Sequence, residues 1–254
     1  MSPRIEVIAI EGLPEVRPGD PLGELIAGAT ARAGEKLAST DIVAVAQKVV
    51  SKAEDRVVDL AEVEAGDRAT EIARRLGKEP RLVELILRES TDVVRAERDV
   101  LIVEGRTGWV SANAGIDASN VPGPERVTLL PVDADASARR LRAELRDVAG
   151  AAPGILIADS FGRPWRRGQV DVAIGCAGIA PLDDWRGRRD RGGAELTATA
   201  IAVGDELAAA ADLVRSKDEG VPAAIVRGLG RFVRSEDGPG ATVLRRPRDE
   251  DLFR

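Results

Sequence analysis

The stretch "LIADSFGRPWRRGQVD", Leu156 to Asp171, decides how the middle of this chain folds. The apolar run from Gly154 to Ala158 has the composition of a short buried strand. An acid and a hydroxyl, Asp159 and Ser160, follow directly, and after them come arginines, a tryptophan, glycines and a proline. We therefore expect a strand that ends at a cleft and leads into a shaped loop.

The polar residues of this stretch point to two kinds of ligand. An acid beside a hydroxyl suits a metal ion, although the same residue types commonly cap helices and turns. A guanidinium can bind two oxygens of one phosphate or carboxylate. We therefore predict that Arg163, Arg166 and Arg167 hold an anion, with an ordinary solvated surface as the alternative.

Strands and helices alternate irregularly on both sides of this stretch. The predicted strands are Ile5 to Ile10, Ile42 to Ala46, Val100 to Glu104, Gly108 to Ala112, Val127 to Leu130, and the segments 170–182, 195–203 and 222–228. The predicted helices begin at Asp20–Pro21 and cover Glu64 to Leu76, Pro80 to Glu89, 135–150 and 204–217. This order predicts an α+β fold with a mixed β-sheet and flanking helices, in which residues 1–254 form a single domain with two lobes.

Composition excludes several classes of protein. The net charge is −6 and the isoelectric point about 5.1, which argues against nucleic acid as a partner. No apolar run approaches the ~20 residues needed to span a membrane, and the first residues do not resemble a secretory signal. A lone cysteine, Cys176, rules out an intrachain disulfide. We expect a cytoplasmic protein.

The absence of histidine and tyrosine limits the chemistry further. Without histidine, Ser-His-Asp and Cys-His catalysis and imidazole-bound metals are excluded. One cysteine cannot complete a structural zinc site. Any metal should therefore be a hard cation such as Mg²⁺ or Mn²⁺ held by oxygen atoms, and acid–base work falls to Asp, Glu or Lys.

Two further segments carry candidate ligands. In "NAGIDASNVPG", Asp117 and Asn120 could share one concave turn, although an Asx turn explains the same residues. In "QKVVSK", Lys48 and Lys52 follow a predicted strand and could each place a positive charge near a phosphate. The chain has neither a P-loop nor a Rossmann motif, so a nucleotide would be bound by another architecture.

Taken together, six blocks of the sequence resemble the coenzyme F420-0:L-glutamate ligase family, also called F420-0:gamma-glutamyl ligases. The blocks run in family order over nearly the whole chain, from about Ile5 onward. They are "GLPEVRPGDPL", "DIVAVAQKVVSKAE", "SANAGIDASNVPG", "IADSFGRPWRRGQVDVAIGCAGI", "WRGRRDRGGAELTATAIAVGDELAAAADL" and "GVPAAIVRGLG".

The resemblance implies an enzyme of coenzyme F420 biosynthesis. Such a ligase uses GTP to add L-glutamate to the coenzyme F420-0 precursor, first through an amide bond and then through a gamma-linked bond. It implies divalent cations, Mg²⁺ or Mn²⁺ and two per site, with help from K⁺, in a homodimer of mixed α+β fold. Some relatives carry a C-terminal reductase domain, which we do not expect in this chain.

The resemblance also implies roles for individual residues. Asp117 and Asp159 match metal ligands, and Ser160 matches a ligand of a second metal. The positions that match GTP contacts are Leu13, Pro14, Glu15, Val16, Gln47, Lys52 and Asn120. The segment from Lys217 to Glu219 matches a variable stretch near the nucleotide and metal, and no definite ligand is carried onto it.

Two alternatives remain at this stage. Relatives often have Ser or Thr where this chain has Gln47, and Trp109 and Ser111 also differ. A paralogous GTP-dependent ligase that acts on a different carboxylate is therefore the main alternative. A catalytically silent nucleotide-binding partner of a reductase would be expected to lack an acid or lysine, but Asp117, Asp159 and Lys52 are all present.

Overall fold

The structure is a computed structural model that describes residues 4–215 and 219–253. Its strands are β1 (Glu6–Ile10), β2 (Ile42–Ala46), β3 (Val57–Asp59), β4 (Ser90–Glu97), β5 (Val100–Gly105), β6 (Val110–Ala112), β7 (Arg126–Thr128), β8 (Gly154–Arg163), β9 (Arg166–Ala177), β10 (Asp183–Asp184), β11 (Ala200–Ile201) and β12 (Ala223–Arg227). Its α-helices are α1 (Leu22–Arg32), α2 (Gln47–Ala53), α3 (Asp67–Leu76), α4 (Pro80–Arg88), α5 (Ala134–Ala149) and α6 (Val203–Asp212). The predicted α+β class is confirmed.

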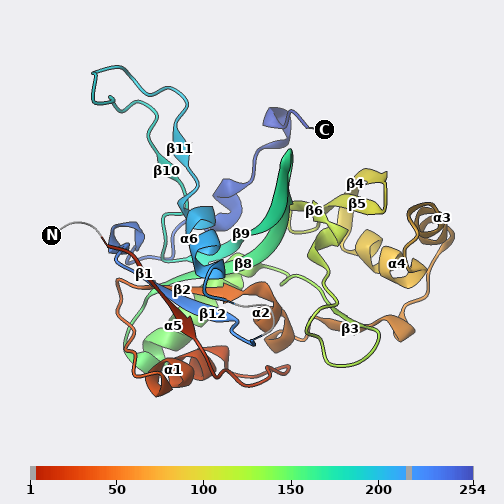
Figure 1. The fold of residues 1–254 in the computed structure, drawn as a ribbon, viewed down its shortest axis with the longest axis horizontal. Helices are drawn as coiled ribbons and strands as arrows, with labels where there is room; N and C mark the ends of the chain where they lie inside the picture. The colour runs from red at the N-terminus through yellow and green to blue at the C-terminus, as the bar shows by residue number, and fades with distance from the viewer. Residues whose placement is uncertain (1–3, 216–218, 254) are drawn as a thin grey trace.

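A five-stranded sheet forms the body of the molecule, with the strand order β1-β12-β2-β8-β9 (Figure 1). β2 and β8 run parallel, whereas the other neighbouring strands are antiparallel. The sheet is therefore mixed, as the sequence predicts. Within the described ranges, every helix is too short or too polar to cross a membrane.

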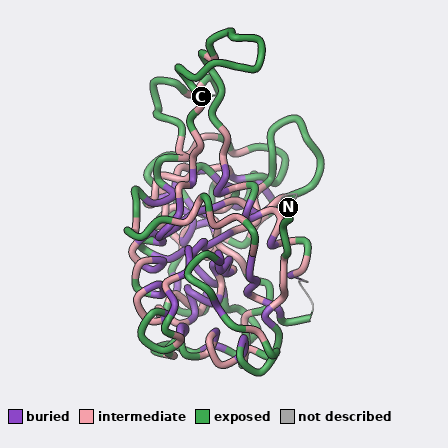
Figure 2. The backbone as a smooth tube through the Cα atoms, turned by 90° about the vertical axis from the view of Figure 1, so that its left-hand side faces the viewer, coloured by how far each residue is buried: buried purple, intermediate pink, exposed green. Residues whose placement is uncertain are grey.

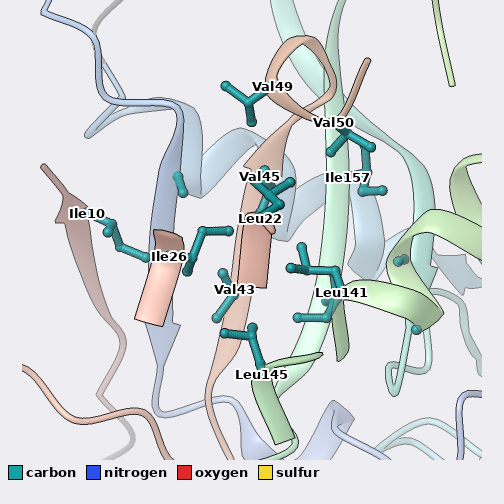
Figure 3. Close-up of a cluster of buried hydrophobic side chains, with 14 of the residues drawn as sticks. Ile10, Leu22, Ile26, Val43, Val45, Val49, Val50, Leu141, Leu145 and Ile157 are labelled. Carbon is teal, nitrogen blue, oxygen red and sulfur yellow. The ribbon is translucent and has the colours of Figure 1, made fainter. Parts of the chain in front are cut away.

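Strand β2 and the part of β8 that pairs with it, Gly154 to Ala158, are apolar without interruption because both faces of the sheet are covered there. In β2, Val43 and Val45 pack into the cluster beneath α1 and α5, while Ile42 and Ala44 pack into the cluster beneath α6. Figure 3 shows Leu22 and Ile26 of α1 and Leu141 and Leu145 of α5 gathered around Val43 and Val45. The sheet is thus the middle of three layers.

A smaller part of the molecule lies beyond the sheet, on the right of Figure 1. Helices α3 and α4 pack against the three-stranded sheet β4-β5-β6 around Leu101 and Val103. A further cluster lies between α4 and the β3-β7 pair, around Val127 and Leu129. These clusters are separate from those on the large sheet.

Strand β8 does not end at Ala158, and the sequence-based expectation of a loop there is wrong. It continues to Arg163 and pairs with β9 in one long hairpin that turns at Pro164–Trp165. Glycine and arginine are typical of loops, but an antiparallel hairpin that extends beyond the core tolerates them equally well, so composition does not distinguish the two. A register shift between Ile157 and Ala158 marks a β-bulge next to Asp159.

Other elements also differ from expectation. Of the predicted strand 195–203, only Ala200–Ile201 forms a strand, β11, and Glu195 makes an isolated bridge to Arg189, because the segment belongs to an exposed arm between β10 and β11 (top of Figure 2). The polar stretch after β2 forms α2, and β4 was not expected. Helix α3 begins at Asp67, three residues after Glu64, and α1 begins at Leu22, immediately after Pro21.

The contact between α5 and β9 gives a prediction about stability. A Cβ atom on Gly175 would lie 2.4 Å from the backbone C and O of Ala134, so helix or strand would have to shift. We expect Gly175→Ala to lower the free energy of unfolding by about 1–3 kcal/mol or more, measured by urea denaturation. Gly162→Ala, in the same hairpin with no neighbour within 4 Å, is the matched control and should change little. Equal stability of the two variants would contradict this packing.

Candidate active site

A cavity of about 340 Å³ opens where β2 ends and its neighbour β8 continues. It brings together segments that are far apart in the sequence. All ten residues predicted to bind metal or GTP line it: Leu13, Pro14, Glu15, Val16, Gln47, Lys52, Asp117, Asn120, Asp159 and Ser160. Other lining residues include Lys48, Asp171, Asp212 and Arg215.

The end of β2 explains why Asp159 is accessible. β2 pairs with β8 from Ile42–Gly154 to Ala46–Ala158, and then the chain of β2 turns into α2. Asp159 is therefore the first residue of β8 without a parallel neighbour. The prediction that Asp159 stands at the end of its own strand is therefore wrong: β8 continues past it, and the strand that ends beside it is β2.

Lys48 and Asp117 form an ion pair on one wall of the cavity. The ammonium of Lys48 lies 2.8 Å from Asp117 Oδ2 and also donates to the carbonyl and hydroxyl of Ser119, at 2.6 and 2.7 Å. Burial alone would raise the pKa of Asp117, but the hydrogen bonds from Lys48 and Ser119 outweigh it and hold that pKa below its usual value. Asp117 is therefore ionised at neutral pH.

Lys52 ties two other segments of the cavity wall together. Its ammonium donates to Glu15 Oε1 at 2.5 Å and to the backbone carbonyl of Asn120 at 2.9 Å. The side chain of Gln47 is buried, and its amide oxygen accepts a hydrogen bond from Ser51. Gln47 thus packs into the wall of the cavity, and its side-chain oxygen already accepts a hydrogen bond there.

Asp159 is the acid of the cavity with the least compensation. Burial raises its pKa to about 7, and the nearby carboxylates of Asp171 and Asp117 add to this effect. Among the residues that the structure describes, no lysine or arginine forms an ion pair with it. An acid held in this way is suited to a cation, which would replace the missing positive charge.

The donor set of the cavity fits a nucleotide-bound Mg²⁺ or Mn²⁺ ion. Such ions are commonly held by one or two carboxylates together with phosphate oxygens and water. Asp117, Asp159 and the hydroxyl of Ser160 supply hard oxygen atoms. No group of three or more acids, cysteines or histidines gathers in the described part of the chain, so phosphate oxygens would have to complete the coordination.

The three arginines predicted to hold an anion lie elsewhere. Arg163, Arg166 and Arg167 flank the exposed turn of the β8–β9 hairpin, and none of them lines the cavity. Arg163 donates to the backbone carbonyl of Arg167 at 3.1 Å, while Trp165 stacks edge-on against Phe253. An anion bound by these arginines would therefore lie outside the cavity.

Some residues of the cavity were missed in the sequence. Asp171 and Arg215 gave no local signal, although a predicted hairpin would have placed Asp171 opposite Ser160. Lys48 was considered only as a general phosphate contact. Of the segment predicted to lie near nucleotide and metal, residues 216–218, and with them Lys217, fall outside the described residues.

The raised pKa of Asp159 predicts an effect of pH on stability. Its carboxyl ionises near pH 7 when folded but near pH 4 when unfolded, so the wild type loses stability as the pH rises between these values. Without metal, we expect Asp159→Asn to be more stable than the wild type by roughly 2–4 kcal/mol at pH 8, and by less at pH 5. Urea unfolding in EDTA at both pH values measures this difference.

Two comparisons complete this prediction. Added Mn²⁺ should stabilise the wild type and not Asp159→Asn, because only the wild type regains the missing positive charge. The exposed residue Asp99 provides the control, since Asp99→Asn should shift stability equally at both pH values. An Asp159→Asn protein that is less stable than the wild type at pH 8 in EDTA would show that the charge is already compensated.

Comparison with known proteins identifies the family of this chain. Residues 12–228 match the sequence profile of the family described as F420-0:Gamma-glutamyl ligase. A protein named Coenzyme F420:L-glutamate ligase from Methanothermobacter thermautotrophicus is 45% identical over 251 residues, which cover 98% of this chain and 99% of the relative. Proteins of the same name from Methanopyrus kandleri and Methanocaldococcus jannaschii are 47% and 38% identical over 254 residues, covering 99% of this chain and 97% of each relative. The chain therefore belongs to the F420-0:gamma-glutamyl ligase family.

Proposed function

We propose that this protein is a GTP-dependent ligase of coenzyme F420 biosynthesis, which joins L-glutamate to the coenzyme F420-0 precursor. The observation that carries the proposal is that ten residues from four separate segments, all implied by the family resemblance, line one cavity. The relatives are named for ligation of L-glutamate to coenzyme F420, which supports L-glutamate and the coenzyme precursor as substrates.

The reaction requires activation of a carboxylate. In the proposed first step, a carboxylate oxygen of the precursor attacks the γ-phosphorus of GTP, and GDP leaves. The acyl phosphate that results has a good leaving group. The amine of glutamate then attacks the carbonyl carbon, the C–O bond to phosphate breaks, and the nitrogen loses a proton as the amide forms. A second glutamate would be added by the same steps to the γ-carboxylate of the first.

The residues of the cavity suit the phosphoryl transfer. Asp117, Asp159 and Ser160 would hold the divalent cations, two per site, and these cations would offset the charge on the β- and γ-phosphates. Lys48 and Lys52 provide positive charge at the same wall. With a cation on Asp117, the ammonium of Lys48, which Ser119 would still hold in place, would add positive charge beside the phosphates. None of these roles requires histidine, which the chain lacks.

Other parts of the proposal rest on no contact within the cavity. Assistance by K⁺ and a homodimer are implied by the family resemblance, whereas the cytoplasmic location is proposed from composition and the anion-binding role of Arg163, Arg166 and Arg167 from the chemistry of the guanidinium. Because the arginines lie outside the cavity, their anion would be a distant part of a substrate. Alanine substitution of each arginine, followed by measurement of KM for both acids, tests that role directly.

A turnover assay tests the proposal. Purified protein with GTP, Mn²⁺, L-glutamate and the F420-0 precursor should give products heavier by one or more glutamyl units, together with GDP, as followed by mass spectrometry. We expect Asp159→Ala to lower kcat by at least about 100-fold, because it removes a ligand of the cation that offsets phosphate charge. Asp99→Asn, on an exposed turn, should leave activity unchanged.

Each failure has a distinct meaning. GTP binding without glutamylation of the precursor would favour a paralogous ligase that acts on another carboxylate. Product formed equally well in EDTA would refute the role of the cation. If the protein neither binds GTP nor forms product, the proposal as a whole is wrong.

A further inference from the structure

Ser160 and Asp171 lie directly opposite each other in the β8–β9 hairpin. The side chains of such a pair project from the same face of the sheet. Ser160 Oγ lies 2.6 Å from Asp171 Oδ1, a distance typical of a hydroxyl that donates to an ionised carboxylate. A carboxylate only accepts hydrogen bonds, so the hydroxyl proton must point toward Asp171.

Arg215 fixes the other side of Asp171. It follows α6 and donates from Nη2 to Asp171 Oδ2. Both side chains are almost completely buried, with 4% of Arg215 and 7% of Asp171 exposed. Within the described residues, Nε and Nη1 of Arg215 have no other acceptor. The guanidinium therefore depends on Asp171 for compensation, and Asp171 is held in one orientation.

The position of the hydroxyl proton determines what Ser160 offers to the cavity. With its proton directed at Asp171, the lone pairs of Oγ are free for a cation. We propose that Asp171, held by Arg215, is a positioning residue that orients Ser160 as a cation ligand. This inference rests on the cation-dependent part of the proposed function and assigns roles to two residues outside the predicted set.

Two observations favour positioning over direct coordination by Asp171. Each carboxylate oxygen already has a partner, Oδ1 in Ser160 and Oδ2 in Arg215. A cation bound directly to Asp171 would share the carboxylate with the positive charge of Arg215, which has no other acceptor in the described residues. Partners that orient metal ligands typically change metal affinity 10–100-fold when they are removed.

The test is a double-mutant cycle on Mn²⁺ affinity. Replacing Asp171 alone by an apolar residue would leave a buried, unpaired Arg215, so the pair is replaced together as Asp171→Leu with Arg215→Met, which removes both charges of the pair. The four proteins are the wild type, Ser160→Ala, the pair variant and the combination of all three changes. Electron paramagnetic resonance measures bound Mn²⁺ with the ion alone and with GDP, and circular dichroism checks folding.

We expect the pair variant to weaken Mn²⁺ binding about 10–100-fold. The combined variant should bind no more weakly than Ser160→Ala alone, because Asp171 acts only through Ser160. Asp171→Asn retains one acceptor oxygen and should give a smaller loss, which provides a second measurement if the pair variant does not fold. Asp205→Asn is the matched control. This acid on α6 accepts a hydrogen bond from the backbone N–H of Ala173 in β9 and does not contact Ser160.

Three outcomes would overturn the inference. Multiplied losses in the combined variant would show that Asp171 binds the cation directly. Wild-type affinity in both the pair variant and Asp171→Asn would show that Ser160 needs no positioning. If the wild type itself binds no Mn²⁺, alone or with GDP, the cation part of the proposed function fails together with this inference, which separates that failure from the first two.

Discussion

The parallel pairing of β2 with β8 is the constraint on which the rest of the structure depends. Because both strands are covered on both faces, they must be apolar along their paired length, from Ile42 to Ala46 in β2. Where β2 ends, its chain departs into α2 while β8 continues. The polar side chains that follow, Asp159 and Ser160, lie at this gap and can face a cavity without disturbing the core.

Three of the acids that line the cavity form ion pairs among the described residues, and Asp159 does not. The ion pairs are Lys48 with Asp117, Lys52 with Glu15, and Arg215 with Asp171. Asp159 has no such partner in the described part of the chain, and its raised pKa reflects that imbalance. A buried acid without a positively charged partner lowers the stability of the folded protein. Such an acid is therefore typical of a site whose ligand supplies the positive charge.

Local sequence patterns predicted the fold class and most of the central strands. The apolar run of β2 was assigned from Ile42 to Ala46 without error, because a strand buried on both faces leaves a continuous signal. The continuation of β8 to Arg163 was missed, since outside the core a hairpin can carry glycine and arginine as readily as a loop. The strand expected at 195–203 failed for the opposite reason: its composition suits a strand, but little of it has a partner to pair with.

Local sequence patterns also limit which residues of the site can be predicted from the sequence. Asp117, Asp159 and Lys52 belong to continuous segments that resemble a known family, so the sequence alone made them candidates, and all three line the cavity. Asp171 becomes meaningful only when the hairpin places it opposite Ser160, and Arg215 only when the end of α6 lies against the same strand. A side chain that acts by orienting another leaves no motif of its own, because its role depends on register and packing between distant segments. Such residues are found by following the hydrogen bonds outward from the predicted ligands.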